Sequence, residues 1–410
     1  MPRTLLVCGA LCTAALCQEP LPEANRTAIS SRAGEIEAQR ERKARQLQPD
    51  QPSRIEHILQ TVKNKEVLER ITNGVGGVRA HLGGLVTGSG FAAGPEYYRS
   101  LARDSVVFRA SVRGSLRKFY VLDLGLEMPK LADGHIFVDF YGVHRDYPHI
   151  DYYGPGPDSS KAGRTGFTLE DTSFDLRTGV RPVEHLRLGV AGRYWLVNVG
   201  PGRDDRFASA DRVYSPALAP GILQQANYLI GGGFIECDWR DNPGGPRRGG
   251  NYTAQYTAWS DDKLRTGSFD RLDLEAQQYI SFFNQRRVIA LRGRGSFTDP
   301  RSGQFVPFYA QPHLGGSDDL RGFRPFRFYD RNSLVFNGEY RWEVFSGLDM
   351  ALFVDAGKVF HCWQDAGFGD LERSYGFGFR FNVRNDVFLR IDTGFSREGF
   401  QVWFKFNNVF

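Results

Sequence analysis

The clearest structural pattern of the chain lies in 375-YGFGFRFNVRNDVFLRIDTGFSREGFQVWFKFNNVF-410. Large apolar side chains fill every second position in it, and glycine, polar or charged residues fill the positions between. At the end of the chain, one set is Phe400, Val402, Phe404, Phe406 and Phe410, and the other is Gln401, Trp403, Lys405 and Asn407. This period of two predicts β-strands, because successive side chains of a strand point to opposite faces.

The same alternation extends toward the N-terminus as far as about residue 76. Turn residues divide it into sixteen expected strands, at 77–84, 89–98, 105–115, 119–128, 134–143, 165–181, 185–197, 227–239, 250–262, 268–282, 286–297, 333–345, 349–360, 374–384, 386–396 and 399–410. Short connections alternate with long ones, and the long ones are 144–164, 198–226, 298–332 and 361–373. Outer-membrane barrels have this asymmetry between their two ends. We therefore predict an all-β fold, a sixteen-stranded antiparallel transmembrane β-barrel over residues 76–410, with both termini facing the periplasm.

A soluble β-sandwich alternates in the same way, but it points aromatic side chains inward and exposes charged ones. A membrane barrel reverses this arrangement, with aromatic side chains toward lipid and charges toward a polar lumen. Three observations favour the barrel: an export signal begins the chain, strands continue without a second type of domain, and the last strand is aromatic. The expected localisation is the bacterial outer membrane, with its lipid as a partner.

The composition argues against two other classes of protein. The formal net charge of the 410 residues is only +5, which predicts no nucleic-acid partner. Beyond the N-terminal segment, no apolar run approaches the ~18 residues that a membrane-spanning helix needs. The mean hydropathy of −0.39 agrees with this. A barrel strand needs only about 9–11 residues, so a barrel remains compatible with the composition.

Residues 1–17 are expected to be a signal peptide, since Arg3 precedes a short apolar run that ends in small residues before Gln18. Acylation of Cys17 is a less favoured alternative, because the residue before it, Leu16, is bulky. Residues 18–75 are rich in charge and carry one helical apolar stripe, which predicts a helical, partly disordered periplasmic extension. This stripe packs against a neighbour or, alternatively, caps a barrel mouth.

No sequence motif for a nucleophile, a metalloprotease or a redox pair occurs, so we expect no enzymatic activity and no cofactor. A cluster of His144, Asp146, His149 and Asp151 lies in one expected loop. Such residues can bind a metal, but a polar outer loop without a ligand is the favoured interpretation. In the mature chain only Cys237 and Cys362 remain, and two unpaired thiols are favoured over a disulfide.

The most specific signal is 311-QPHLGGSDDLRGFRPFRFYDRNSLVFNGEYRWE-343. It contains Leu320-Arg321-Gly322-Phe323, and then Glu339 before Tyr-Arg; the next strand contains Phe353-Val354-Asp355-Ala356-Gly357. Upstream, 238-DWRDNPGGPRRGG-250 supplies Asp238, Arg240, Asp241, Asn242 and Pro243. Together with an aromatic last strand ending in Phe406 and Phe410, these motifs resemble the BamA/TamA superfamily of outer-membrane assembly factors, the bacterial surface antigen domain, over about 76–410.

The resemblance implies insertion or translocation of proteins at the outer membrane, through weak pairing of the first and last strands. It also implies that the long loop folds into the lumen, where Arg321 forms a latch with Glu339 and Asp355 beside Gly357. A planar guanidinium suits such carboxylate partners. Phe406 and Phe410 would form the assembly signal. The first strand region is rich in glycine, which would weaken a seam, although tight turns explain the glycines equally well.

The sequence departs from this family upstream, because residues 18–75 are too few for a POTRA domain and do not have its order of elements. The expected partners are therefore unfolded outer-membrane proteins or a POTRA-bearing periplasmic protein. Two alternatives remain open from the residues: a passive pore or structural barrel, and an outer-membrane lipid hydrolase. Conductance measurements and a serine-reactive probe would distinguish them.

Overall fold

The computed structural model describes residues 76–406, apart from 84, 103, 223 and 384, together with positions 39 and 42. Within this part the chain is almost entirely β-structure. The elements are β1 (Val78–Leu82), β2 (Ala92–Leu101), β3 (Val106–Ser115), β4 (Tyr120–Leu131), β5 (Ile136–Tyr152), η1 (Lys161–Gly163), β6 (Thr165–Val183), β7 (Leu186–Pro201), α4 (Ala210–Val213), β8 (Asn227–Asp238), β9 (Gly249–Asp261), β10 (Phe269–Phe282), β11 (Arg287–Pro300), η2 (Phe308–Ala310), β12 (His313–Leu314), β13 (Phe328–Tyr329), β14 (Asn332–Phe345), β15 (Leu348–Phe360), η3 (Trp363–Asp365), β16 (Glu372–Val383), β17 (Asp386–Ser396) and β18 (Gly399–Phe406).

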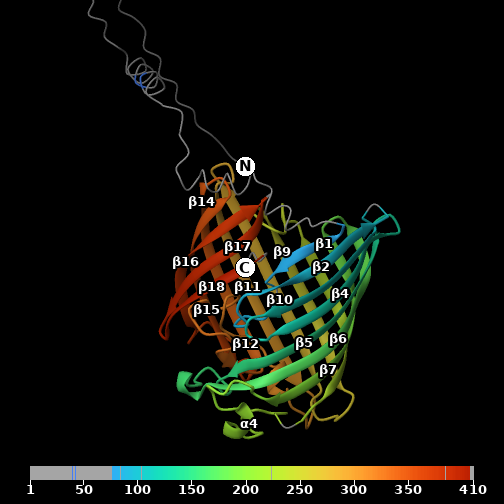
Figure 1. Ribbon diagram of the computed structural model, residues 1–410, viewed down its shortest axis with the longest axis vertical. Helices are drawn as coiled ribbons and strands as arrows, with labels where there is room; N and C mark the ends of the chain where they lie inside the picture. The colour runs from blue at the N-terminus through green and yellow to red at the C-terminus, as the bar shows by residue number, and fades with distance from the viewer. Residues whose placement is uncertain are drawn as a thin grey trace, which may run out of the picture. The chain divides into compact units, whose positions relative to one another are not determined.

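Sixteen of these strands form one sheet in sequence order, β1 to β11 followed by β14 to β18, and each pairs antiparallel with the next. The sheet curls into a ring of tilted strands (Figure 1). The predicted sixteen-stranded antiparallel barrel is therefore confirmed. Among the described residues no ladder joins β1 to β18, so the ring is nearly closed and has one seam.

Apolar side chains cover the outer wall of the barrel. On β18 the exposed fractions of Phe400, Val402 and Phe404 are 64%, 45% and 63%, whereas the alternate side chains face the lumen and are partly covered. Other strands repeat this pattern; their exposed side chains include Leu122, Phe174, Leu176, Val190, Leu229, Tyr256, Leu291, Leu352, Val354 and Tyr375. A soluble sandwich would bury these side chains. The outward apolar face therefore favours a membrane barrel over a soluble sandwich.

The two ends of the barrel differ as the connection lengths predicted. The long connections after β5, β7, β11 and β15 lie at one end, by strand parity, and α4 belongs to that end (Figure 1). The chain enters β1 and leaves β18 at the opposite end, where β6–β7 and β14–β15 are joined by turns of two residues.

The largest error among the predicted boundaries concerns the end of β5; smaller ones, of three or four residues, concern β2, β4, β7 and β11. The expected loop 144–164 begins only after Tyr152, because β5 and β6 remain paired as far as Tyr152 and Thr165. The alternation weakens here, at a register shift between Tyr147 and Ile150, which is why the sequence suggested an early end.

The connection between β11 and β14 enters the lumen and carries the small β12–β13 hairpin. Its apolar side chains form a buried cluster with two side chains of the barrel wall; the cluster comprises Leu314, Leu320, Phe323, Phe328, Val335 and Val359. A second, larger cluster joins this connection to β5–β10 and to the connection after β7, and includes Tyr152, Trp195, Tyr228, Phe308 and Tyr329. Loops therefore fill the end of the barrel where the long connections lie.

Several predictions about the termini lie outside the described residues: the signal peptide 1–17, the extension 18–75, and Phe410. Cys237 and Cys362 are free thiols, as favoured. Among the described residues, no helix is long and apolar enough to cross a membrane.

The orientation of the barrel can be tested with single cysteines in a Cys237→Ser/Cys362→Ser background. Asp158→Cys lies in the long connection after β5, and Glu184→Cys lies in the β6–β7 turn at the other end; both positions are exposed. We expect a membrane-impermeant thiol reagent to label position 158 on intact cells, and to label position 184 only after the outer membrane is broken. The reverse pattern would contradict the orientation.

Candidate functional site: a loop latch beside the barrel seam

Arg321 is the centre of the loop that enters the lumen, and its side chain is only 2% exposed. Its Nε lies 3.0 Å from Asp355 Oδ2, and its Nη2 lies 2.6 Å from Asp355 Oδ1. Its Nη1 donates to Glu339, and its backbone N–H donates to Asp355 Oδ2 at 3.1 Å. The guanidinium also stacks over Phe353, with 3.5 Å from Cζ to the ring centre. The structure thus brings together the loop arginine and both acids that the motifs singled out.

These acids belong to a larger network on the lumen wall. Glu339 on β14 also accepts from Arg341 Nε at 2.6 Å and from Arg380 Nη2 at 2.9 Å. Arg380 on β16 in turn pairs with Asp392 on β17, which Arg390 also contacts at 3.1 Å. Because its members come from β14, β15, β16, β17 and the loop, the network ties four neighbouring strands to one loop residue.

Attraction between opposite charges explains why this burial is tolerated. Four buried arginines share three buried carboxylates, and each carboxylate has at least two donors. Burial lowers the pKa of Arg321, but attraction by Asp355 and Glu339 outweighs it, so the pKa is raised above its ordinary value. Arg321 therefore stays charged, and it supplies the only cation in contact with Asp355 among the described residues.

Glycines let the loop backbone touch the wall. A Cβ on Gly322 would lie 2.6 Å from the carbonyl of Phe395, and a Cβ on Gly394 would lie 2.4 Å from Arg321 O. A Cβ on Gly357 would lie 2.8 Å from Leu334 O on the neighbouring strand and 3.2 Å from the Leu314 side chain of the loop. The motif residues beside the arginine pack at the other side of the backbone: Leu320 and Phe323 are fully buried, and Phe323 meets Phe328 edge to face.

The seam lies beside this latch. β18 pairs with β17 on one side only, and β1 approaches it at Gly83, where a Cβ would lie 3.2 Å from Phe406 Cβ. The lumen loop holds β18 from inside: Trp403 Nε1 donates to Arg321 O at 2.7 Å, and Lys405 Nζ lies 3.1 Å from Asp318 Oδ2.

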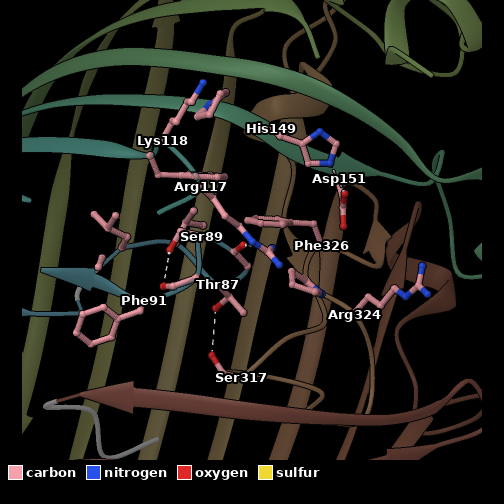
Figure 2. A pocket seen from close by; sticks show the side chains of 18 of the residues that line it. Thr87, Ser89, Phe91, Arg117, Lys118, His149, Asp151, Ser317, Arg324 and Phe326 are labelled. Atoms are coloured by element: carbon pink, nitrogen blue, oxygen red, sulfur yellow. Dashed lines mark hydrogen bonds and ion pairs between the residues drawn. The ribbon is translucent and has the colours of Figure 1, made fainter. Parts of the chain in front are cut away.

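Asp318 also reaches the other side of the seam. Thr87, in the β1–β2 connection, donates to Asp318 Oδ2 at 3.1 Å, and its Oγ1 lies 3.1 Å from Ser317 Oγ (Figure 2). One carboxylate therefore bridges the β1 side and the β18 side. No sequence motif singled out Thr87, Asp318 or Gly394; the one available signal was Gly394, which lies between Asp392 and Ser396 on the lumen face of its strand.

The upstream motif has a different place, at the end of the barrel opposite the long loops. Asp238 pairs with Arg240 at 2.7 Å, while Asp241 Oδ1 accepts three backbone N–H groups of its own turn. Asn242 Nδ2 donates to Asp386 Oδ1 at 2.9 Å, and Pro243 lies exposed in the turn. The β8–β9 turn therefore reaches across to the β16–β17 turn. It does not join the latch.

The turn makes a second contact across the end of the barrel, where Arg247 holds Asp349 of β15 with two contacts of 2.8 and 2.9 Å. Asp349 also accepts from Asn382 Nδ2 at 2.9 Å. The upstream motif thus braces the same β15–β17 wall that the latch binds, but from the opposite end.

The cluster of His144, Asp146, His149 and Asp151 lies on β5, so its assignment to a loop was wrong. His144 Nδ1 contacts Thr172 Oγ1 at 2.9 Å, and His149 Nε2 contacts Asp151 Oδ1 at 2.7 Å. Within the described part of the chain, no three His, Cys, Asp or Glu side chains are arranged to hold a metal ion.

The latch predicts unequal effects of removing its members. Arg321→Ala leaves Asp355 buried without a cation, and such a change costs about 3–5 kcal/mol. Asp355→Ala should cost less, because Arg321 keeps Glu339. The double variant should lose less stability than the two single variants summed. Lys at position 321 should restore only part of the stability. The measurements are the temperature at which the folded band disappears in heat-modifiable electrophoresis, and trypsin cleavage of the loop.

Arg206→Ala is the control, since Arg206 is 72% exposed in its pair with Asp204 and such surface pairs contribute about 0–1 kcal/mol. Additive effects of Arg321→Ala and Asp355→Ala would show that the two residues do not act as a pair.

Comparisons with known proteins agree with this fold. Residues 224–392 match the Omp85 superfamily domain, and no curated protein sequence matches the chain. Among solved structures, BamA from Haemophilus ducreyi lacking POTRA domains 1–3 is similar with a TM-score of 0.57 and 13% identity, over 79% of this chain and 69% of that one.

Two CdiB structures are also similar in fold. CdiB from Escherichia coli has a TM-score of 0.55 and 12% identity, over 81% of this chain and 62% of that one. CdiB from Acinetobacter baumannii has a TM-score of 0.50 and 12% identity, over 80% of this chain and 58% of that one. The chain thus spans less than two thirds of either CdiB chain. Residues 224–392 thus carry the match to the Omp85 superfamily domain, and the barrel that contains them has a fold like that of BamA.

Proposed function

We propose that this protein assists the insertion or translocation of other proteins at the outer membrane, and that it does so without catalysing a chemical reaction. The seam supports this proposal, because the free edge of β18 has no strand partner among the described residues. A free strand edge presents unpaired N–H and C=O groups, so it is a template for a strand of another chain.

The contacts around the seam suit a gate. The β14–β17 wall is fixed by the buried latch, whereas β18 is held on its free side by few contacts, chiefly those of Trp403, Lys405 and Phe406. These contacts are partly exposed to solvent, and surface ion pairs contribute little. Opening the seam therefore requires less free energy than separating any two paired strands of the wall.

A client strand would enter the seam from the periplasmic end, where β1 begins and β18 ends. We propose that unfolded outer-membrane proteins are the clients, and that a POTRA-bearing periplasmic protein delivers them. The β8–β9 turn lies at this end and presents its exposed residues there, so it is the part of the described barrel best placed to meet such a partner.

A disulfide across the seam tests the proposal. With cysteines at Gly83 and Phe406, the Cβ atoms would lie about 3.2 Å apart, close to the ~3.5–4.5 Å of natural disulfides. In the Cys237→Ser/Cys362→Ser background, oxidation should abolish the insertion of a client barrel into liposomes, and a reducing agent should restore it.

The controls are the two single-cysteine variants, which should keep their activity under oxidising conditions and should assemble normally in the membrane. Gly83 has a φ of +73°, so its substitution carries some strain, and the Gly83→Cys control measures that effect. Full insertion by the cross-linked protein would contradict a role for the seam.

The passive-pore alternative makes a different prediction. Loops pack into a buried cluster at the mouth of the barrel that carries the long connections. In planar bilayers we therefore expect the purified protein to show a low, flickering conductance. A large, steady conductance would support the pore instead.

A further inference from the structure

A cavity of about 1280 Å³ lies at the seam, toward the end of the barrel with the long loops. It is bounded by the β1–β2 connection, the β3–β4 turn, the lumen loop and β18 (Figure 2). Its size exceeds the ~300–1,000 Å³ of typical small-molecule sites. It therefore has room for a ligand as large as the headgroup of a lipid.

Positive charge dominates the walls of this cavity, with seven Lys or Arg side chains against four carboxylates. Four of the cations have a carboxylate partner: Arg164 with Asp151, Arg203 with Asp146, Arg206 with Asp204, and Lys405 with Asp318. The other three are Arg117, Lys118 and Arg324, and no carboxylate among the described residues lies within ion-pair distance of them.

Of these three cations, Arg117 extends into the interior of the cavity. Arg117 reaches between Thr87 and Phe326, and its Nη1 donates to Gly88 O at 2.7 Å (Figure 2). This single backbone contact leaves most of its donors unused, because a guanidinium carries five N–H groups. Such donors, together with the ammonium group of Lys118 and the guanidinium of Arg324, suit an anion with several oxygen atoms.

The cavity also opens toward lipid. Its lining includes Val402 and Phe404, which point outward from β18, as well as Gln401 and Trp403, which point into the lumen. Residues from both faces of one strand can line a single cavity only if it passes around the free edge of that strand. Phe91, which is 53% exposed, continues the apolar lining on the other side of the seam.

We propose that this cavity binds the phosphate-bearing headgroup of a membrane lipid, with its acyl chains lying along the apolar outer face of β18. The cations lie at the end of the seam with the long loops, and the apolar residues extend from there along the strand. This order matches an amphiphile whose headgroup lies at the membrane surface. The lipid would fill the seam whenever no client strand occupies it.

The lining favours a lipid over the two other candidates. A free anion would use the cations but would leave Phe91, Val402 and Phe404 without a partner. A client peptide would pair with the backbone edge of β18 and gain little from unpaired cations at the opposite side of the cavity. Only an anionic amphiphile uses both the charged and the apolar parts of the lining.

The experiment uses the full chain, purified in a neutral detergent and studied by native mass spectrometry. The probes are phosphatidylglycerol, phosphorylated lipid A, zwitterionic phosphatidylcholine and inorganic phosphate. We expect one lipid of net negative charge to be retained at detergent concentrations that strip phosphatidylcholine, and inorganic phosphate not to displace it. Tighter retention of lipid A would assign the outer leaflet as the source, and tighter retention of phosphatidylglycerol would assign the phospholipid pool.

The test variant is Arg117→Gln/Lys118→Gln/Arg324→Gln. Its affinity for the retained lipid should fall about 100-fold, since each cation near an anionic headgroup contributes on the order of fivefold. The matched control, Arg99→Gln/Lys130→Gln/Arg286→Gln, removes the same charge from exposed positions at the other end of the barrel and should keep its affinity. A variant with Lys at positions 117 and 324 should retain most of the affinity.

Three results would overturn the proposal. They are equal losses in the test and control variants, retention of phosphatidylcholine as tight as that of the anionic lipids, and displacement of the lipid by inorganic phosphate alone. Lipid retention is measured without a client, so its failure leaves the insertion proposal untouched. If an acidic peptide from the last strand of a client displaced the lipid, and the protein showed no preference among lipids, the cavity would be assigned to clients instead.

Discussion

A single buried cation, Arg321, holds the lumen loop on the barrel wall. Arg321 carries its charge into a lumen that excludes water from it, and that charge is tolerated only because carboxylates from three strands surround it. The same carboxylates need the arginine, since Asp355 would otherwise be an uncompensated buried charge. The loop and the wall are therefore mutually dependent, because each supplies the countercharge that the other buries.

This dependence makes the barrel mechanically uneven. The latch and the β8–β9 brace both contact the strands from β14 to β17. This wall is therefore held at two places, inside the lumen and at the end opposite the long loops. The adjoining β18 has one full ladder and a few side-chain contacts, and the short β1 pairs only with β2. The barrel wall is therefore rigid as far as β17 and more loosely held at β18 and β1. If the edge moves, the contacts of Trp403 and Lys405 with the lumen loop break, whereas the buried latch keeps that loop on the wall.

The sequence predicted most of the fold, because a period of two is a local signal that tertiary contacts did not overrule. The strand that ends at Tyr152 was the exception, since a register shift there broke the alternation. The resemblance of the loop motif brought Arg321, Glu339 and Asp355 to attention, and the structure brings them together. Thr87 and Asp318 were not predictable: neither has a special spacing, and they are 231 residues apart. Their contact depends on barrel closure, which no local pattern encodes.

The brace formed by the β8–β9 turn has a consequence for how the chain itself reaches its native state. Arg247 and Asp349 are 102 residues apart, so their contact closes a large loop late in folding. Contacts of such high sequence separation slow folding, because loop-closure entropy opposes them until the intervening structure exists. The strands between β8 and β15 must therefore be in register before the brace can form. In a barrel with one misplaced strand between β8 and β15, Arg247 and Asp349 would not meet, so the brace forms only in the complete register.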